Sequence, residues 1–236
     1  MNIAGIEKNS FVDYPGKMAA VIFTPRCNMN CFYCHNQMLL SKKPYENLFK
    51  EEEVIKFLTD RKGFLDAVVI SGGEPTLQPD LLSFLSNVKE LGFLVKLDTN
   101  GTNSSLLQET VRAGLVDYVA MDIKAPLEKY YEISRTKLNL DTVNESIDFL
   151  LGSSVDYEFR TTFAPPLTDT DIVAIAQRIK GAKLYVLQKM RYLFPVRDPN
   201  QSEVIHTSDH IISIMEKIKP FVQNCKTRGY DMISVS

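Results

Sequence analysis

The chain has 236 residues, of which 44% are hydrophobic and 24% charged, and its formal net charge is −2. That length accommodates one large α/β domain or two small ones, and the near-neutral charge excludes the strongly basic surface of most nucleic-acid-binding proteins. No apolar run approaches the roughly 20 residues of a membrane-spanning helix, so neither nucleic acid nor a membrane is an expected partner. The first residues lack the basic and apolar regions of a signal peptide, and we therefore expect a cytoplasmic location.

Strand-like and helix-like segments alternate along the chain. Short apolar runs, most of them β-branched, predict strands at residues 18–24, 67–71, 93–99, 118–123, 156–162 and 183–188. Amphipathic patterns predict helices at residues 51–60, 80–91, 104–113, 142–151, 168–179 and 207–219. Three of these helices end at a glycine before the next strand, as helices with C-cap glycines do: Gly92, Gly114 and Gly181.

This alternation predicts an α/β fold with a parallel sheet and right-handed crossovers. The sheet fits either an open, doubly wound arrangement or a curved partial barrel. In both arrangements ligands collect at the C-terminal ends of the strands, so polar residues just after each strand are expected to carry the chemistry. We expect residues 1–236 to form a single domain, with a core at about 11–190 and a helical extension at about 191–236.

Three of the four cysteines, Cys27, Cys31 and Cys34, lie within eight positions after the first predicted strand. Three thiolates in a Cys-x3-Cys-x2-Cys loop can hold three irons of a [4Fe–4S] cluster and leave the fourth iron open to another ligand. A structural zinc site with His35 is the alternative, but zinc ligands usually come as two separated pairs, whereas Cys34 and His35 are adjacent. Cys225, about 190 positions downstream, is interpreted as an incidental thiol.

Two glycines and a glutamate follow the second predicted strand. Gly72, Gly73 and Glu74 lie in the segment Ser-Gly-Gly-Glu-Pro-Thr, and glycines at a strand end let a ligand approach the backbone. A tight strand-to-helix turn would need the same glycines and is the simpler interpretation of this segment alone. Beside the cysteine motif, a ligand site becomes the better interpretation.

Carboxylates mark the ends of the next two predicted strands. Asp98 and Thr99 end the third strand, and Asp122 lies near the end of the fourth, two positions before Lys124. Because side chains alternate along a strand, Ala120, Asp122 and Lys124 are expected on one face. A buried carboxylate needs a partner, so a structural Asp122–Lys124 pair is the alternative to a ligand site.

Polar side chains also occur at the last two predicted strands, where Arg160 and Gln188 are candidates for the site because strand C-termini line it in such folds. Either residue would be ordinary at a strand end. His206 and His210 are four positions apart on a predicted surface helix. That spacing can bind a metal, but no third ligand is evident, and a solvated face is the better interpretation.

The cysteine pattern, with Tyr33 just before the last cysteine, resembles the motif of the radical S-adenosylmethionine (radical SAM) family. The resemblance implies a [4Fe–4S] cluster on Cys27, Cys31 and Cys34, and S-adenosylmethionine as the second cofactor. It also implies that backbone groups beside Tyr33 meet the adenine. The Gly-Gly-Glu-Pro segment resembles the family element that receives the methionyl amino group.

The Asp-Thr-Asn-Gly and Asp-x-Lys segments resemble those of glycyl-radical-enzyme activases, in which the lysine meets the methionyl carboxylate. The resemblance gives Lys124 this role, and Arg160 resembles an arginine that contacts the cofactor. Gln188 is a weaker candidate for the adenine or ribose edge. A monovalent cation beside the carboxylate is also implied, bound by Asp98, Thr99, Ala120 (through its carbonyl) and Asp122.

The motifs run in the family's order from residue 11 to about residue 188 and most resemble the activases of anaerobic ribonucleoside-triphosphate reductases. This resemblance implies a partial (β/α)6 TIM-like barrel that is open on one side. It implies reductive cleavage of S-adenosylmethionine and formation of a glycyl radical on a partner reductase subunit, with flavodoxin or ferredoxin as the electron donor. No further cysteine lies between Cys34 and Gly72, so the ferredoxin-like insert of many activases is absent.

Two alternatives remain open from the sequence. The first is a radical enzyme that acts on a small molecule, such as a 7-carboxy-7-deazaguanine synthase. The second is an iron–sulfur or zinc module without catalytic activity, although such a carrier would not need the glycine-rich and Asp-x-Lys segments. The sequence does not identify the activated partner, the electron donor or the oligomeric state.

Overall fold

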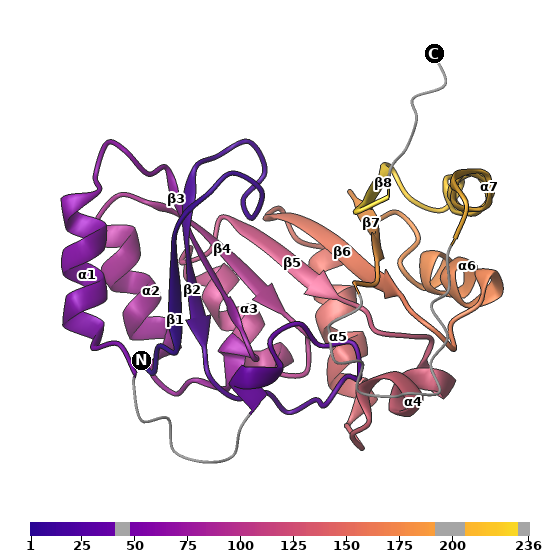
Figure 1. Cartoon of the computed structure of the whole chain (residues 1–236), viewed down its shortest axis with the longest axis horizontal. Coiled ribbons are helices and arrows are strands. Elements are labelled where there is room, and N and C mark those ends of the chain that lie inside the picture. The colour runs from indigo at the N-terminus through magenta and orange to yellow at the C-terminus, as the bar shows by residue number, and fades with distance from the viewer. Residues whose placement is uncertain (41–47, 192–205, 231–236) are drawn as a thin grey trace. The chain divides into compact units, whose positions relative to one another are not determined.

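The structure is a computed structural model that describes residues 1–40, 48–191 and 206–230 (Figure 1). Its strands are β1 (Gly5–Ser10), β2 (Ala19–Thr24), β3 (Ala67–Gly72), β4 (Leu94–Thr99), β5 (Tyr118–Asp122), β6 (Asp156–Phe163), β7 (Tyr185–Lys189) and β8 (Cys225–Arg228). Its α-helices are α1 (Glu51–Asp60), α2 (Leu81–Glu90), α3 (Ser104–Arg112), α4 (Tyr130–Ser134), α5 (Leu140–Leu151), α6 (Asp169–Arg178) and α7 (Ser208–Ile218). The sheet order follows the chain order from β1 to β8.

The six predicted strands and six predicted helices are all present, with ends that lie within two residues of those expected. Gly92, Gly114 and Gly181 have φ angles of 90°, 68° and 89°, which confirms that these helices end in left-handed glycines. Among the described residues, no helix has the length and apolar character needed to cross a membrane.

Besides short 3-10 helices, two strands and one α-helix of the described residues were not predicted. The sequence of β1 is mostly polar, and this strand pairs antiparallel with β2, with Ile6 opposite Ile22. Strand β8 has only four residues, alternately half-buried and exposed, and pairs parallel with β7. Helix α4 has five residues, too few for a helical pattern to emerge. The expected helical extension therefore contains a strand as well as α7, while residues 192–205 and 231–236 lie outside the described residues.

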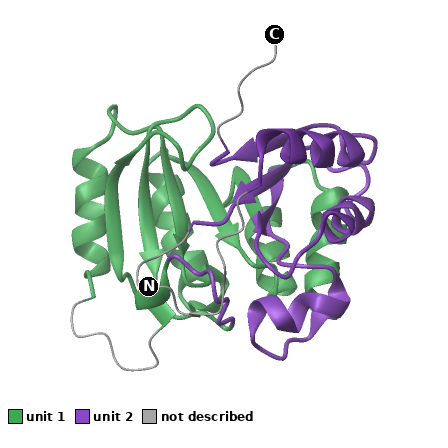
Figure 2. Ribbon diagram, turned by 45° about the vertical axis from the view of Figure 1, so that its right-hand side comes forward, with its two compact units in different colours: residues 1–28, 36–120, 141–156 green, residues 29–35, 121–140, 157–236 purple. Residues whose placement is uncertain are grey.

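Two compact units make up the chain (Figure 2). The first comprises residues 1–28, 36–120 and 141–156, and the second comprises residues 29–35, 121–140 and 157–236. The boundary passes through the cysteine motif, so Cys27 belongs to the first unit and Cys31 and Cys34 belong to the second. The predicted site residues accordingly fall into two groups.

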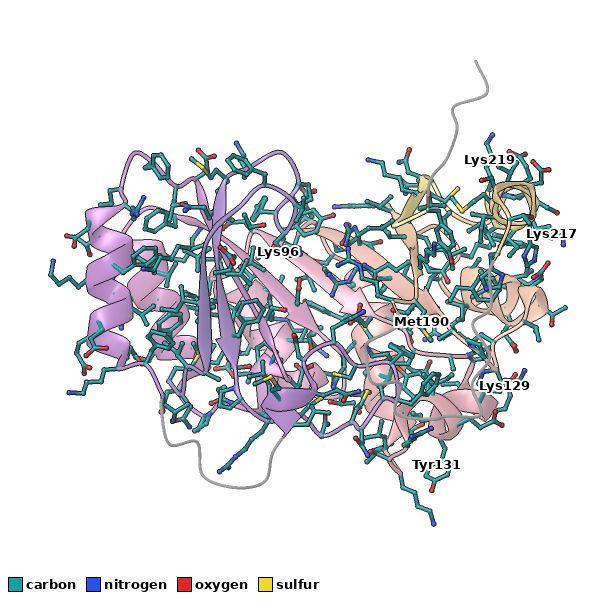
Figure 3. The ribbon with its side chains drawn as sticks, in the orientation of Figure 1. Lys96, Lys129, Tyr131, Met190, Lys217 and Lys219 are labelled. Atoms are coloured by element: carbon teal, nitrogen blue, oxygen red, sulfur yellow. The ribbon has the colours of Figure 1, made fainter. Side chains whose placement is uncertain are left out.

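In the first unit, strands β2, β3 and β4 are parallel neighbours, with Val21 opposite Val69 and Val69 opposite Lys96. The apolar part of β3, residues 67–70, is completely buried, as its continuous apolar sequence predicts. Figure 1 shows α1 and α2 beside these strands. Lys96 lies among the strands of this unit (Figure 3) and is almost completely buried, which requires a charged partner.

In the second unit, strands β6, β7 and β8 are parallel neighbours. Their register places Thr162 opposite Gln188, and Gln188 opposite Arg228, at the C-terminal ends of the strands. Phe159 of β6 and Tyr185 of β7 are fully buried, and helices α6 and α7 of this unit pack on each other. The strand ends therefore bring polar residues from distant parts of the sequence to one edge of this unit.

Candidate functional site

The loop that leads to Cys27 is held on both sides by backbone hydrogen bonds. Arg26 adopts a left-handed conformation with φ 69°, which is rare for a residue with a side chain. Its N–H donates to the carbonyl of Leu39 at 2.7 Å, and its carbonyl accepts from the N–H of Glu74 at 2.8 Å. These contacts fix the path of the chain from β2 into the cysteine motif.

The two glycines after β3 are required by the close approach of this loop. A Cβ atom on Gly73 would lie 1.8 Å from the carbonyl oxygen of Arg26, and one on Gly72 would lie 2.4 Å from the backbone nitrogen of Thr24. Gly72 also has φ 117°, which side chains rarely tolerate. The two glycines therefore form the tight turn that was the simpler interpretation. A ligand role of the same backbone stays a prediction.

The carboxylate of Glu74 is 1% exposed and is surrounded by internal donors. Its Oε1 accepts from the backbone N–H of Thr76 at 3.1 Å, from the Thr76 hydroxyl at 2.6 Å and from the Thr99 hydroxyl at 2.7 Å. Its Oε2 accepts from the N–H of Asn100 at 2.7 Å. Burial raises the pKa of Glu74, and these hydrogen bonds oppose that effect. Glu74 therefore joins the end of β3 to the end of β4.

Asp98 forms an ion pair with the buried ammonium of Lys96 at 2.7 Å. Its second oxygen accepts from the hydroxyl of Ser71 at 3.0 Å. Among the described residues, no group of three or more His, Cys, Asp or Glu side chains is placed to hold a metal ion. The carboxylate that was expected to bind a monovalent cation is thus already paired with a side-chain cation, and the cation site stays a prediction.

In the second unit, Asp122 lies between two cations. Lys124 Nζ donates to Asp122 Oδ2 at 2.9 Å, and Arg160 Nε donates to Oδ1 at 2.7 Å. Burial alone would raise the pKa of Asp122, but the charges and hydrogen bonds of Arg160 and Lys124 hold it well below its usual range. Burial opposes the charge of Lys124, whereas Asp122 raises the pKa of Lys124 well above its usual value. The predicted pair is therefore present, with Arg160 as a third member.

This group continues toward the C-terminal strand. Glu158 on β6 lies 3.9 Å from Arg160 Nη1 and accepts a hydrogen bond from Arg228 Nη2 of β8 at 3.3 Å. This group of ion pairs thus contains three cations and two carboxylates: Lys124, Arg160 and Arg228 with Asp122 and Glu158. An excess of positive charge at a strand end suits an anionic group such as a carboxylate.

The second part of the cysteine motif rests on α4. The N–H of Asn30 donates to the carbonyl of Ser134 at 2.9 Å, and the Arg135 guanidinium lies 5.2 Å from the centre of the Phe32 ring. Tyr131 of the same helix points away from the ribbon (Figure 3) and is 60% exposed. An element that the sequence did not predict therefore supports the loop that carries Cys31 and Cys34.

Tyr33 and Cys31 belong to the same loop and are buried. Burial raises the pKa of both groups, and the nearby charge of Lys124 opposes the rise. The Tyr33 hydroxyl has no hydrogen-bond partner among the residues that the structure describes. None of the four cysteines is in a disulfide, so three soft donors remain available in the Cys-x3-Cys-x2-Cys loop, as an iron–sulfur cluster requires. The residue types of the motif therefore suit the predicted cluster, and their joint binding of iron stays a prediction.

His206 and His210 are partly exposed, and each also contacts a neighbouring side chain of the same unit. His206 stacks on Phe163 with ring centres 4.2 Å apart, and the Nδ1 atoms of His206 and His210 lie 3.1 Å apart. His210 Nε2 is 2.8 Å from an oxygen of Asp169, which Lys217 of α7 also contacts at 3.3 Å. These contacts join α7 to β6 and α6, which explains the histidines without a metal.

Sequence reasoning assigned no role to Asn28 or Asn100, although both lie in motifs that it singled out. In the structure their side chains are hydrogen bonded to each other at 2.9 Å, and the Asn100 amide lies 3.8 Å from Cys27 Sγ. Their separation of 72 positions left no local signal of this contact.

Comparison with known proteins gives consistent results. The family described as "Radical SAM superfamily" matches residues 21–179. A protein of Methanocaldococcus jannaschii with the name "Putative glycyl-radical enzyme activating enzyme" is 41% identical over 197 residues, which cover 79% of each chain. The pyruvate formate-lyase-activating enzyme of Clostridium pasteurianum is 30% identical over 191 residues, or 77% of each chain.

A solved structure shows the same fold at low sequence identity. The crystal structure of Streptococcus suis SuiB bound to S-adenosylmethionine matches with a TM-score of 0.67 and 12% identity over 90% of this chain. The match covers 52% of the SuiB chain, so this chain spans about half the length of SuiB. The likeness confirms the expected α/β class of partial-barrel type.

Proposed function

Because the chain belongs to the radical SAM superfamily, we propose that it is a glycyl-radical-enzyme activase whose partner is an anaerobic ribonucleoside-triphosphate reductase. The superfamily establishes the cofactors, a [4Fe–4S] cluster and S-adenosylmethionine. The observation that supports the activase role most is the 41% identity to the Methanocaldococcus jannaschii protein across 79% of both chains. A cytoplasmic location stays a prediction from the sequence.

Cys27, Cys31 and Cys34 would hold the cluster. Three protein thiolates leave one iron of a four-iron cluster without a cysteine ligand, which is where the second cofactor binds. When bound, the cluster and S-adenosylmethionine supply the electron and the radical, and the protein contributes placement and exclusion of competing reactions. The backbone of the Arg26–Glu74 contact holds the first cysteine in position for this role.

The remaining predicted contacts are part of the same proposal. The backbone beside Tyr33 would meet the adenine, and the backbone of Gly72 and Gly73 would receive the methionyl amino group. Glu74 would act from behind this backbone, because its carboxylate is fully used by internal donors. Gln188, half-buried at the end of β7, would contact the adenine or ribose.

Lys124 would bind the methionyl carboxylate. In the structure it shares Asp122 with Arg160, so Asp122 keeps a charged partner if Lys124 turns toward a ligand. Arg160 would then contact the cofactor while it neutralises Asp122. A monovalent cation at Asp98, Thr99, Ala120 and Asp122 would compete with the ammonium groups of Lys96 and Lys124 for the two carboxylates.

The proposal is tested by anaerobic reconstitution of the full chain with iron and sulfide. Reduction by dithionite, or by a flavodoxin or ferredoxin, should release 5′-deoxyadenosine from S-adenosylmethionine. Addition of an anaerobic ribonucleoside-triphosphate reductase should then produce a glycyl radical signal in electron paramagnetic resonance (EPR). Release of 5′-deoxyadenosine without a glycyl radical on any reductase would contradict the partner. Turnover of a small molecule without a protein partner would favour the alternative of a synthase-like radical enzyme.

A further inference from the structure

Asn100, directly after β4, has a side chain whose orientation is fixed by its surroundings. The residue is 5% exposed. Its Oδ1 accepts from the backbone N–H of Thr102 at 3.0 Å and from the Thr102 hydroxyl at 2.6 Å. A backbone N–H can only donate, so the oxygen must face Thr102 and the NH2 group must face the opposite way.

The NH2 group of Asn100 can donate two hydrogen bonds, and it contacts two groups of the cysteine motif. One contact is to Asn28 Oδ1 at 2.9 Å, and the other is to Cys27 Sγ at 3.8 Å. Sulfur is larger than oxygen and accepts at longer distances, so the second contact is within the range of an N–H···S hydrogen bond. The amide is thus aimed at one of the three predicted cluster ligands.

A closed ring of hydrogen bonds holds this amide in place. Asn100 donates to Asn28, Asn28 Nδ2 donates to the Thr102 hydroxyl at 2.8 Å, and that hydroxyl donates back to Asn100. The backbone N–H of Asn100 is held separately by Glu74. Hydrogen bonds in such a ring polarise one another, and the amide cannot rotate without breaking several of them.

We propose that Asn100 donates a hydrogen bond to the Cys27 thiolate of the bound cluster and thereby raises the cluster's reduction potential. The reduced cluster carries one more negative charge than the oxidised cluster, and an N–H dipole aimed at a ligand sulfur stabilises the more negative state. The inference rests on the cluster that the proposed function also needs. Asn100 is then a positioning residue that acts on the cluster through Cys27.

A purely structural role makes a different prediction. If the ring serves only to join the cysteine loop to the end of β4, then Thr102→Val, which removes the ring hydroxyl, should affect the cluster as much as Asn100→Ala does. If the N–H···S contact is what matters, Thr102→Val should have little effect. The backbone N–H of residue 102 still holds Oδ1, and the NH2 group still faces Cys27.

The experiment is a redox titration of the reconstituted full chain, monitored by EPR, without S-adenosylmethionine and without a partner reductase. Iron and sulfide content verify that each variant holds a complete cluster. For Asn100→Ala, we expect the ratio of reduced to oxidised cluster at a fixed potential to fall about tenfold, a shift of about −59 mV for a one-electron couple. Asn100→Asp should shift the potential further in the same direction, because it adds a negative charge. Thr102→Val should stay close to the parent.

An unchanged potential in Asn100→Ala with a complete cluster would overturn the proposal, as would an equal shift in Thr102→Val. If Asn100→Ala does not retain its cluster, Asn100→Leu, which keeps the approximate shape of the side chain without adding a charge, decides the question in the same titration. Loss of the cluster in both variants would assign Asn100 a structural role and also overturn the proposal. Because no reductase is present, failure to activate any partner leaves this result unaffected.

Discussion

The site carboxylates Glu74 and Asp122, one in each unit, have different kinds of partner. In the first unit, Glu74 is enclosed by neutral donors from Thr76, Thr99 and Asn100, which leave it no capacity for a ligand. In the second unit, Asp122 accepts hydrogen bonds from two cations, Lys124 and Arg160, and either cation can also bind another anion. Under the proposed function, the first group would fix the backbone around the cofactor, whereas the second group would provide positive charge for it.

The largest expected effect comes from the cysteine motif. Cys31→Ala removes one of three thiolates, and two cannot hold a four-iron cluster, so cluster binding and 5′-deoxyadenosine release should fall to background. Iron content and the absorbance of the reconstituted protein measure the outcome. Cys27→Ala and Cys34→Ala should behave alike, and a full cluster in any of the three would contradict the ligand assignment.

The role of Glu74 as an anchor predicts a stability effect. Glu74→Gln replaces an acceptor oxygen with an NH2 group that faces other donors, and it should lower the free energy of unfolding by about 1–3 kcal/mol. Urea denaturation of the unreconstituted protein measures this change. Glu145→Gln is the matched control, because Glu145 is exposed and is held by the hydroxyl of Ser104. Equal effects in both variants would show that the burial of Glu74 is not what matters.

The proposed contact between Lys124 and the methionyl carboxylate predicts an effect on cofactor binding, whereas Glu74 affects stability. Lys124→Ala should weaken S-adenosylmethionine binding roughly tenfold or more, since a hydrogen bond to a charged group contributes about 1.5–3 kcal/mol, while the cluster is retained. Isothermal titration of the reconstituted protein measures the affinity. Lys217→Ala, which removes a lysine from α7, serves as the control. Cluster loss in Lys124→Ala would identify the Asp122 pair as structural.

The two carboxylates also predict opposite dependences of stability on pH. The pKa of Asp122 is lowered in the folded state, so its contribution is present above the unfolded pKa of about 3.9 and is lost as pH falls through the lower folded value. The pKa of Glu74 is raised, so its contribution is present below about 4.3 and is lost as pH rises through the higher folded value. Urea midpoints across this range should lose their acid slope in Asp122→Asn, and Glu74→Gln should remove the opposite slope. Identical pH profiles for the two variants would contradict the contrast.

The smallest effect is expected at the fourth cysteine. Cys225 begins β8 and is half-buried, and burial raises the pKa of its thiol, so it is less reactive than an ordinary thiol at neutral pH. Cys225→Ala should change iron content and 5′-deoxyadenosine release little, and stability by less than about 1 kcal/mol. A clear loss of iron in this variant would mean that the C-terminal strand takes part in cluster binding.

Much of the architecture could be read from local sequence. The β-branched apolar runs of β2 and β3 and the C-cap glycines after three helices are local signals, and they predicted the elements to within two residues. The cysteine motif is equally local, because its ligands are close in sequence. β1, β8 and α4 were missed because they are short or polar and are stabilised by contacts with distant segments.

The sequence by itself determined the fold class, the three cysteines and the order of polar strand ends, since each depends on residues within one segment. Only the tertiary structure decided which groups these residues meet. Glu74 meets Asn100, Asn100 meets Asn28 across 72 positions, and Asp122 meets Arg160 across 38 positions. Such pairs form because the fold brings neighbouring strands and the loops that follow them together, and a buried polar side chain without a partner lowers stability. Neither the spacing nor the composition of a single segment contains that information.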